Sequence, residues 1–84
     1  MLICWSTHAW EDYLHWQKVD KKTLDRVNRL IKEITRNPYE GLGDPEPLKH
    51  NWSGFWSRRI DREHRIVYKV EADRLYIAQC RYHY

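Results

Sequence analysis

The side chains that could do chemistry in this chain are one acid, several cations and a histidine next to the last residue. Glu46 stands between two prolines, so the backbone that carries its carboxylate is stiffened on both sides. Arg65 and Arg81 supply guanidinium groups, and His83 supplies an imidazole, the side chain suited to acid or base work near neutral pH. Attack of a ribose 2′-hydroxyl on the neighbouring phosphorus needs a base, an acid and cations that stabilise the phosphorane. These residue types therefore suit metal-independent cleavage of RNA.

The same stretch also fits nucleic-acid binding without catalysis. Cations alternate with aromatic side chains from Gly54 to Tyr84, a combination that suits phosphates and bases. Residues 49–69 hold six Lys and Arg against two acids, whereas the formal charge of the whole chain is only +3, so the positive field is local. Composition alone leaves Glu46 open as a solvated loop acid and His83-Tyr84 open as a frayed terminus. A solvated strand face is a third interpretation that charge leaves open.

Length and composition predict one domain, residues 1–84, with a single small core. No apolar run is long enough to cross a bilayer and no signal peptide follows Met1, so we expect a cytoplasmic protein without a membrane partner. Cys4 and Cys80 are too few for a disulfide framework and fit no zinc spacing. We therefore expect two small buried apolar side chains, and no metal or other cofactor.

Two helices are expected in the first half of the chain. The first begins after Ser6 or Thr7 and runs to Val19, with an apolar stripe at helical spacing formed by Trp10, Tyr13, Leu14 and Gln17. Trp16 falls off this stripe and is expected as a surface or partner contact. Asp20 caps the second helix, which ends at Asn37-Pro38 and whose apolar stripe is Leu24, Val27, Leu30, Ile31 and Ile34. The pair is expected to form an antiparallel hairpin laid over a sheet.

The sheet is expected from the second half, with one short apolar strand at residues 2–5. Residues 55–60, 65–71 and 75–82 show strand patterns separated by turns, which predicts an antiparallel meander. The Gly- and Pro-rich segment 39–49, which carries Glu46, is expected to lack regular structure.

The predicted alternation also sets which side chains share a face. If even-numbered residues of the last two strands face the helices, the open face carries Arg65, Gln79, Arg81 and His83. The register of the preceding strand leaves open whether Arg58 or Arg59 points outward beside Arg65, because a one-residue shift exchanges the two.

Several segments together resemble the YoeB-type toxins of the RelE/ParE superfamily. They are WEDYLHWQ in the first helix, PEPLKH around Glu46, GFWSRRI and EHRIVY in the sheet, and RYHY at the end. The resemblance covers nearly the whole chain. It implies an α+β fold like that of compact microbial ribonucleases, a twisted antiparallel sheet with two N-terminal helices packed on one face.

The resemblance also implies roles for single residues. Glu46 corresponds to the family's general base, His83 to its general acid and Arg65 to the arginine on the scissile phosphate, with Tyr84 beside them at the end of the chain. The residues expected to bind or orient substrate are Lys49, Arg59 and Glu63, joined by Arg81 from the charge pattern. This correspondence selects Arg59, rather than Arg58, as the outward residue.

The activity implied is that of a ribosome-dependent messenger-RNA endonuclease that cleaves in the A site and inhibits translation. The partners implied are the ribosome with its messenger and a partly disordered, YefM-like antitoxin. Operator DNA is expected as a partner only of the toxin–antitoxin complex, and a homodimer is possible. Two alternatives stay open: a non-catalytic RNA- or ribosome-binding module, which needs the arginines but neither Glu46 nor His83, and an antitoxin-dependent DNA co-repressor.

Overall fold

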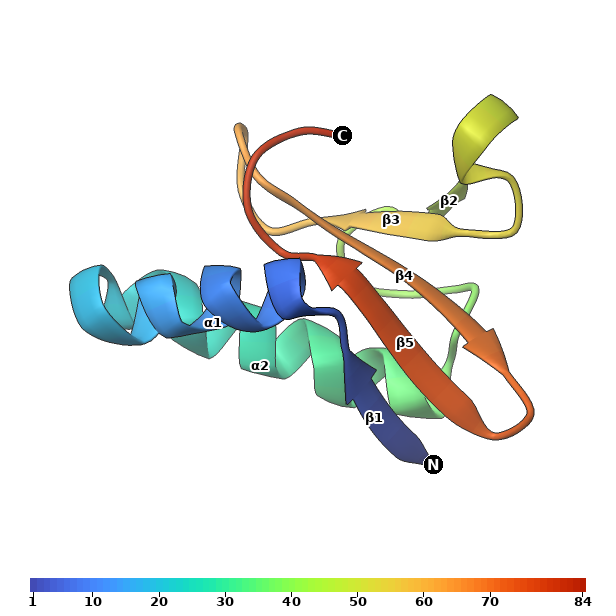
Figure 1. Cartoon of the computed structure of the whole chain (residues 1–84), viewed down its shortest axis with the longest axis horizontal. Helices are drawn as coiled ribbons and strands as arrows, with labels where there is room; N and C mark the ends of the chain where they lie inside the picture. The colour runs from blue at the N-terminus through green and yellow to red at the C-terminus, as the bar shows by residue number, and fades with distance from the viewer.

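The computed structural model describes all residues from 1 to 84 and contains two helices and one five-stranded sheet (Figure 1). The helices are α1 (Thr7–Val19) and α2 (Lys21–Arg36). The strands are β1 (Leu2–Trp5), β2 (Glu46–Pro47), β3 (Trp56–Arg59), β4 (Arg65–Glu71) and β5 (Arg74–Gln79), and a short 3-10 turn spans His50–Trp52. Both helices cover one face of the sheet, so the α+β fold expected from the sequence is confirmed.

The sheet has the strand order β1-β5-β4-β3-β2. Pairing is antiparallel from β3 to β5, as expected, and also between β2 and β3, but β1 joins β5 in parallel and makes the sheet mixed. The edge strand β2 was not expected, because Gly and Pro surround it. Its two residues pair with β3 alone. Pro47 has no backbone N–H to donate, and an edge strand tolerates this because no further strand lies on its outer side.

The second helix agrees with its sequence pattern. The carboxylate of Asp20 accepts the Thr23 amide at 3.1 Å and the Thr23 hydroxyl at 2.8 Å, and these bonds, the amide first, lower the pKa of Asp20. The buried residues of α2 are Val27, Leu30, Ile31 and Ile34, and Asn37 follows the last turn as its C-cap. Neither helix of the protein combines the length and the apolar content that a bilayer-crossing segment needs.

The buried face of α1 differs from the predicted one. Trp16 is only 5% exposed and belongs to the core, whereas Trp10 is 45% exposed, so the expectation that Trp16 is a surface contact was wrong. The Trp16 indole donates to the Cys80 carbonyl at 2.8 Å, and the Asp12 carboxylate accepts the Cys80 amide at 3.0 Å. Hydrogen bonds to the backbone just after β5 therefore decide which face of α1 turns inward. The spacing of apolar residues in the sequence does not reveal such bonds.

A β-bulge in β5 changes its alternation. Leu75 and Ile77 are buried against the helices, opposite to the predicted even-numbered pattern. The register shifts between the pairs Val67↔Gln79 and Tyr68↔Ile77, which leaves Ala78 as the extra residue. Beyond the bulge the predicted alternation is restored, because Gln79 pairs on the open face and Cys80 is buried.

The two cysteines differ in their surroundings. Cys80 is fully buried, and Cys4 on β1 is only partly buried. Burial, followed by the nearby charge of Asp12, raises the pKa of Cys80 to about 12. Its thiol therefore stays protonated at neutral pH and packs as a small apolar group, in agreement with the expectation for this residue.

Candidate active site

A buried arginine supports the loop that leads to Glu46. The Arg58 side chain is 0% exposed and donates to the Leu42 carbonyl at 3.1 Å, to the Glu40 carbonyl at 2.9 Å, and to the Asn37 carbonyl. Its Nε donates to the Tyr68 hydroxyl at 3.0 Å. The outward alternative for Arg58 is thereby excluded, and Arg59 is the exposed residue. Arg58 instead fixes the path of the backbone between α2 and β2.

Loss of Arg58 is expected to be severe for folding. Arg58→Met would keep the volume but leave three carbonyls of the 37–42 loop without a donor, and each unsatisfied buried acceptor costs about 1–3 kcal/mol. We expect the free energy of unfolding to fall by about 3 kcal/mol or more, measured by urea denaturation. Arg36→Met, at the exposed end of α2, is the control and should cost less than about 0.5 kcal/mol. Equal stability of the two variants would contradict the supporting role of Arg58.

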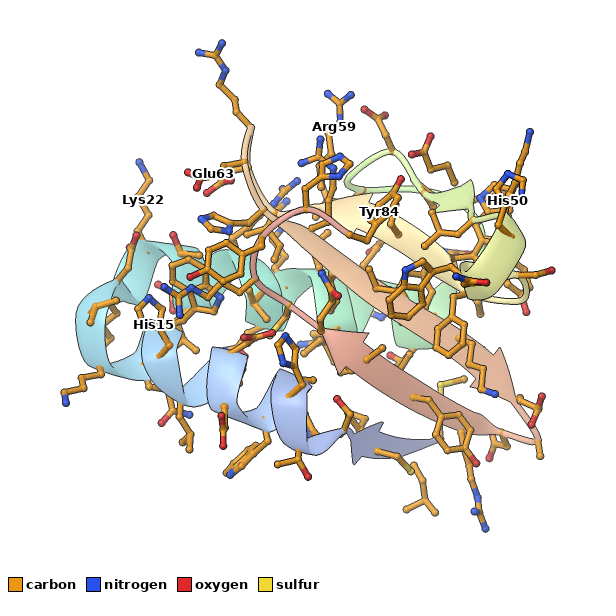
Figure 2. All side chains as sticks on the ribbon, turned by 45° about the horizontal axis from the view of Figure 1, so that its top comes forward. His15, Lys22, His50, Arg59, Glu63 and Tyr84 are labelled. Atoms are coloured by element: carbon orange, nitrogen blue, oxygen red, sulfur yellow. The ribbon has the colours of Figure 1, made fainter.

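Glu46 begins a row of residues on the sheet face opposite the helices. Register pairs Glu46 with Ser57, Ser57 with Val67, and Val67 with Gln79. Ser57 and Val67 are buried although no helix covers this face. The last residues of the chain fold back over it instead, so that the labelled Tyr84 lies over the sheet rather than beyond its end (Figure 2).

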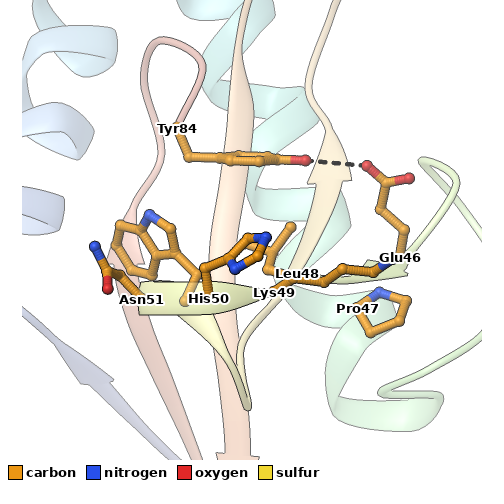
Figure 3. Close-up of a pocket in the computed structure, with 8 residues that line it drawn as sticks. Glu46, Pro47, Leu48, Lys49, His50, Asn51 and Tyr84 are labelled. Atoms are coloured by element: carbon orange, nitrogen blue, oxygen red, sulfur yellow. Dashed lines mark hydrogen bonds between the residues drawn. The ribbon is translucent and has the colours of Figure 1, made fainter.

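The C-terminal tail, residues 81–84, brings Tyr84 to Glu46 and His83 against Tyr84. The Tyr84 hydroxyl donates to Glu46 Oε1 at 3.0 Å (Figure 3). The His83 ring stacks on the Tyr84 ring with 4.6 Å between centroids and 29° between planes. A carboxylate, a phenol and an imidazole therefore form one contiguous group, although the first is 37 residues or more from the others in sequence.

The route of the tail differs from the predicted one. The strand ends at Gln79, and Tyr82 has φ +64 and is 50% exposed, so it does not continue the core face as expected. His83 is accordingly not an outward residue of an extended strand. It stacks on Tyr84, which bonds to Glu46, because the chain turns back at Tyr82.

A pocket of about 490 Å³ opens beside this group. Its lining residues are Glu46, Pro47, Leu48, Lys49, His50, Asn51, Trp52 and Tyr84. Figure 3 shows the Tyr84 ring across the pocket from His50 and Asn51. Aromatic rings here offer stacking surfaces for a base and Lys49 offers a cation for phosphate. The volume is in the range of small-ligand sites, about 300–1,000 Å³.

His50 and Trp52 were not predicted as site residues. Their position in the sequence just after Glu46 and Lys49 was the signal that could have identified them as site residues. Their inward placement depends on the 3-10 turn, where His50 has φ +57, and no glycine marks that turn in the sequence.

Among the predicted cations, Lys49 lines the pocket, whereas Arg59 ends β3 and Arg65 begins β4. Arg59 and Arg65 are direct neighbours across β3 and β4. Their positive charges repel each other, and a bound anion would reduce this repulsion. Arg59 is exposed, and Figure 2 shows it on the same side of the molecule as Tyr84 and Glu63. Arg65 is half-buried, and its Nη1 donates to the Asp61 carbonyl at 2.9 Å and to the His64 carbonyl at 3.1 Å. Arg65 therefore also supports the backbone of the turn between β3 and β4, although it makes no contact with the core.

Arg81 and Glu63, two other predicted site residues, do not line the pocket. The guanidinium of Arg81 lies over the Tyr82 ring at 4.5 Å. Glu63 is at the turn between β3 and β4, where its carboxylate is 3.8 Å from His64 Nε2, and no ion pair joins it to His83. No three His, Cys, Asp or Glu side chains gather as a metal-binding group in the protein.

The family model for YoeB-like toxins of bacterial type II toxin–antitoxin systems matches residues 5–84. The chain belongs to this family. Toxin YoeB of Escherichia coli K12 is 60% identical over 84 residues, which cover 100% of both chains. The YoeB/ParE toxin from Agrobacterium tumefaciens superposes with a TM-score of 0.98 at 46% identity, over 100% of both chains. The toxin of a YoeB–YefM complex from Staphylococcus aureus superposes with a TM-score of 0.92 at 48% identity, over 100% of this chain and 99% of that one.

The protein is therefore a toxin of a type II toxin–antitoxin system, as the sequence resemblance indicated. Membership of the YoeB family gives no residue its role by itself. The roles below rest on the group formed by Glu46, Tyr84 and His83 and on the neighbouring cations.

Proposed function

We propose that this YoeB-family toxin is a metal-independent endoribonuclease that cleaves messenger RNA in the ribosomal A site and so inhibits translation. The observation that carries the chemical part is the contiguous group of Glu46, Tyr84 and His83 at the pocket edge. The requirement for the ribosome is inferred from the resemblance to YoeB-type toxins. Lys49, Arg59 and Arg65 supply the positive charge that a polyanionic substrate needs beside this group.

The proposed step is a transesterification within the substrate. Glu46 takes the proton of a ribose 2′-hydroxyl, whose oxygen bonds to the adjacent phosphorus. The bond from phosphorus to the 5′-oxygen breaks, and His83 gives that oxygen a proton. Arg65 and Arg59 donate to the phosphorane oxygens as charge grows on them. Tyr84 orients the Glu46 carboxylate through its hydroxyl. The products are a 2′,3′-cyclic phosphate and a 5′-hydroxyl.

The chemistry of the cut ends tests this mechanism. Ribosomes programmed with a defined messenger should yield a 2′,3′-cyclic or 3′-phosphate upstream and a 5′-hydroxyl downstream, because the nucleophile belongs to the substrate. EDTA added after ribosome assembly, with ribosome integrity checked by sedimentation, should leave the rate of the chemical step unchanged. Ends that carry a 5′-phosphate and a 3′-hydroxyl would mean that water was the nucleophile, and the roles of Glu46 and His83 would then be wrong.

The same assay separates catalysis from binding alone. Glu46→Gln keeps the size of the side chain and its bond to Tyr84 but removes the base. Arrest of translation by this variant without cutting would favour the binding-module alternative.

We further propose that a YefM-like antitoxin inhibits this toxin by covering the tail and the cations beside it. The S. aureus complex supports such a partner. A segment with acidic and apolar residues would compete with RNA for Arg59 and Arg65. Because charge pairs are screened by salt, the double variant Arg59→Ala/Arg65→Ala should weaken antitoxin binding and flatten its salt dependence, measured by calorimetry at two salt concentrations. An unchanged affinity and salt dependence would place the antitoxin elsewhere.

Three further expectations belong to the same proposal. Operator DNA is expected to bind only the toxin–antitoxin complex. Self-association and a cytoplasmic location stay predictions for this toxin.

A further inference from the structure

We propose that His64 is a positioning residue, whose neutral imidazole holds the C-terminal tail where Tyr84 bonds to Glu46 and His83 stacks on Tyr84. His64 precedes Arg65 at the start of β4 and lies outside the pocket residues. The kinetic consequence of this inference rests on the proposed ribonuclease function, whereas its structural consequence does not.

The contact that carries the inference is a hydrogen bond from the Tyr82 amide to His64 Nδ1, 2.7 Å long. The carbonyl of the same residue accepts the Arg65 amide at 3.0 Å. Two neighbouring residues thus hold both polar backbone groups of Tyr82. This residue has φ +64, a conformation that tyrosine rarely adopts and that persists only where its surroundings fix it. The turn that redirects His83 and Tyr84 therefore depends on this pair of bonds.

The His64 imidazole is itself held in place by the core. Its ring meets the Trp16 ring edge-on, with 4.8 Å between centroids and 77° between planes. Trp16 is fixed in turn by its bond to the Cys80 carbonyl. The His64 amide donates to Asp61 Oδ1 at 2.8 Å. The His64 side chain is only 12% exposed, so it has little freedom to release the tail while the core is intact.

The hydrogen bond also fixes the protonation of the ring. Because Nδ1 accepts from the Tyr82 amide, the proton of the neutral imidazole is on Nε2. Nε2 is 3.8 Å from Glu63 Oε1, so the Glu63 charge favours this tautomer. Glu63 therefore has a structural role, which differs from the contact with substrate that the sequence predicted.

A doubly protonated imidazole would present a donor to the Tyr82 amide and lose the bond. The charged and titratable groups around the ring are Asp61 and Glu63 in the same turn, Arg65 on the His64 carbonyl, Arg81 over the Tyr82 ring, and His15 against the Trp16 ring. They do not alter the requirement for a free lone pair at Nδ1.

The test compares two substitutions at the same position. His64→Asn keeps an acceptor oxygen close to the place of Nδ1, whereas His64→Leu has similar branching and no acceptor. His15→Leu is the matched control, because His15 also meets the Trp16 ring, at 5.0 Å, and does not contact the tail. The first readout is amide hydrogen exchange at Tyr82, with the Cys80 amide as an internal reference for the intact core. The second is kcat and KM on programmed ribosomes.

We expect His64→Leu to speed exchange at Tyr82 by more than about tenfold while the Cys80 amide stays protected. Its kcat should fall by about 10–100-fold with little change in KM, because the tail no longer holds the acid in position. His64→Asn and His15→Leu should stay within about fivefold of the parent toxin in both measurements. Should His64→Leu fail to fold, His64→Gln, whose amide oxygen lies one carbon farther out, replaces it in the comparison.

Two results would overturn the inference. One is wild-type exchange and kcat in His64→Leu. The other is equal loss of kcat in the Asn and Leu variants while the Asn variant keeps Tyr82 protected, because the ring and not the acceptor would then matter. If the parent toxin does not cleave RNA, the proposed function fails, yet exchange at Tyr82 still decides whether His64 holds the tail.

Discussion

A chain that ends at Tyr82 is expected to lose messenger cleavage by about 10²–10⁴-fold, the usual contribution of a general acid, while it keeps its fold. The truncation removes His83, the proposed proton donor, and Tyr84, the hydrogen-bond partner of Glu46. The core beneath the helices is unaffected, because Cys80 is the last buried residue and Tyr82 retains both of its backbone bonds, whereas Ser57 and Val67 on the opposite face lose part of their cover. The rate is measured by single-turnover cleavage on programmed ribosomes, and the fold by circular dichroism and thermal unfolding.

Single substitutions divide this loss between the two residues. Tyr84→Phe removes only the hydroxyl that bonds to Glu46, whereas His83→Gln removes the acid and leaves a polar side chain. We expect the larger loss from His83→Gln. A truncated toxin that cleaves at the rate of the full chain would show that the last two residues are a frayed end without a catalytic part.

Arg65→Ala is expected to cost about 2.7–4 kcal/mol of transition-state stabilisation, the effect of removing one well-placed donor to a developing oxyanion. The same change also removes the bonds to the Asp61 and His64 carbonyls. We therefore expect a loss of about 1 kcal/mol in the free energy of unfolding as well, which is modest beside the catalytic effect. Cleavage and urea denaturation on one preparation separate the two effects.

Arg62→Ala is the matched control for charge. Arg62 is exposed in the same turn, and its loss changes the net charge equally without touching these carbonyls. We expect less than about a tenfold decrease in cleavage, from weaker attraction for phosphate alone. Equal effects of the two substitutions would make Arg65 a general contributor of charge instead of a catalytic residue.

The sequence predicted the elements of this fold better than their faces. A clean apolar stripe and the Asp20 cap were sufficient for α2, since burial alone decides its orientation. They were insufficient for α1, because Asp12 and Trp16 face inward to bind the backbone of Cys80. The strand alternation failed at Ala78, where a bulge without a glycine or proline signal moves each preceding residue to the other face.

The candidate site shows the same limit. The resemblance named Glu46, His83 and Tyr84, but no spacing rule predicts that a tail directed away from the sheet turns back to Glu46. That turn depends on a tyrosine at φ +64 held by a histidine side chain, and neither residue type marks such a turn. His50 and Trp52 escaped prediction for a similar reason, because a turn without glycine directs them into the pocket.

The parallel pairing of β1 with β5 has a consequence for biosynthesis. Leu2 pairs with Arg74 and Trp5 with Ile77, and the buried face of α1 binds the backbone of Cys80. The first strand and first helix thus find their partners far along the chain, and contacts so distant in sequence form slowly. During synthesis, a chain whose residues from β5 onward are still inside the exit tunnel has neither partner. Such a chain cannot complete its core or bring Tyr84 to Glu46.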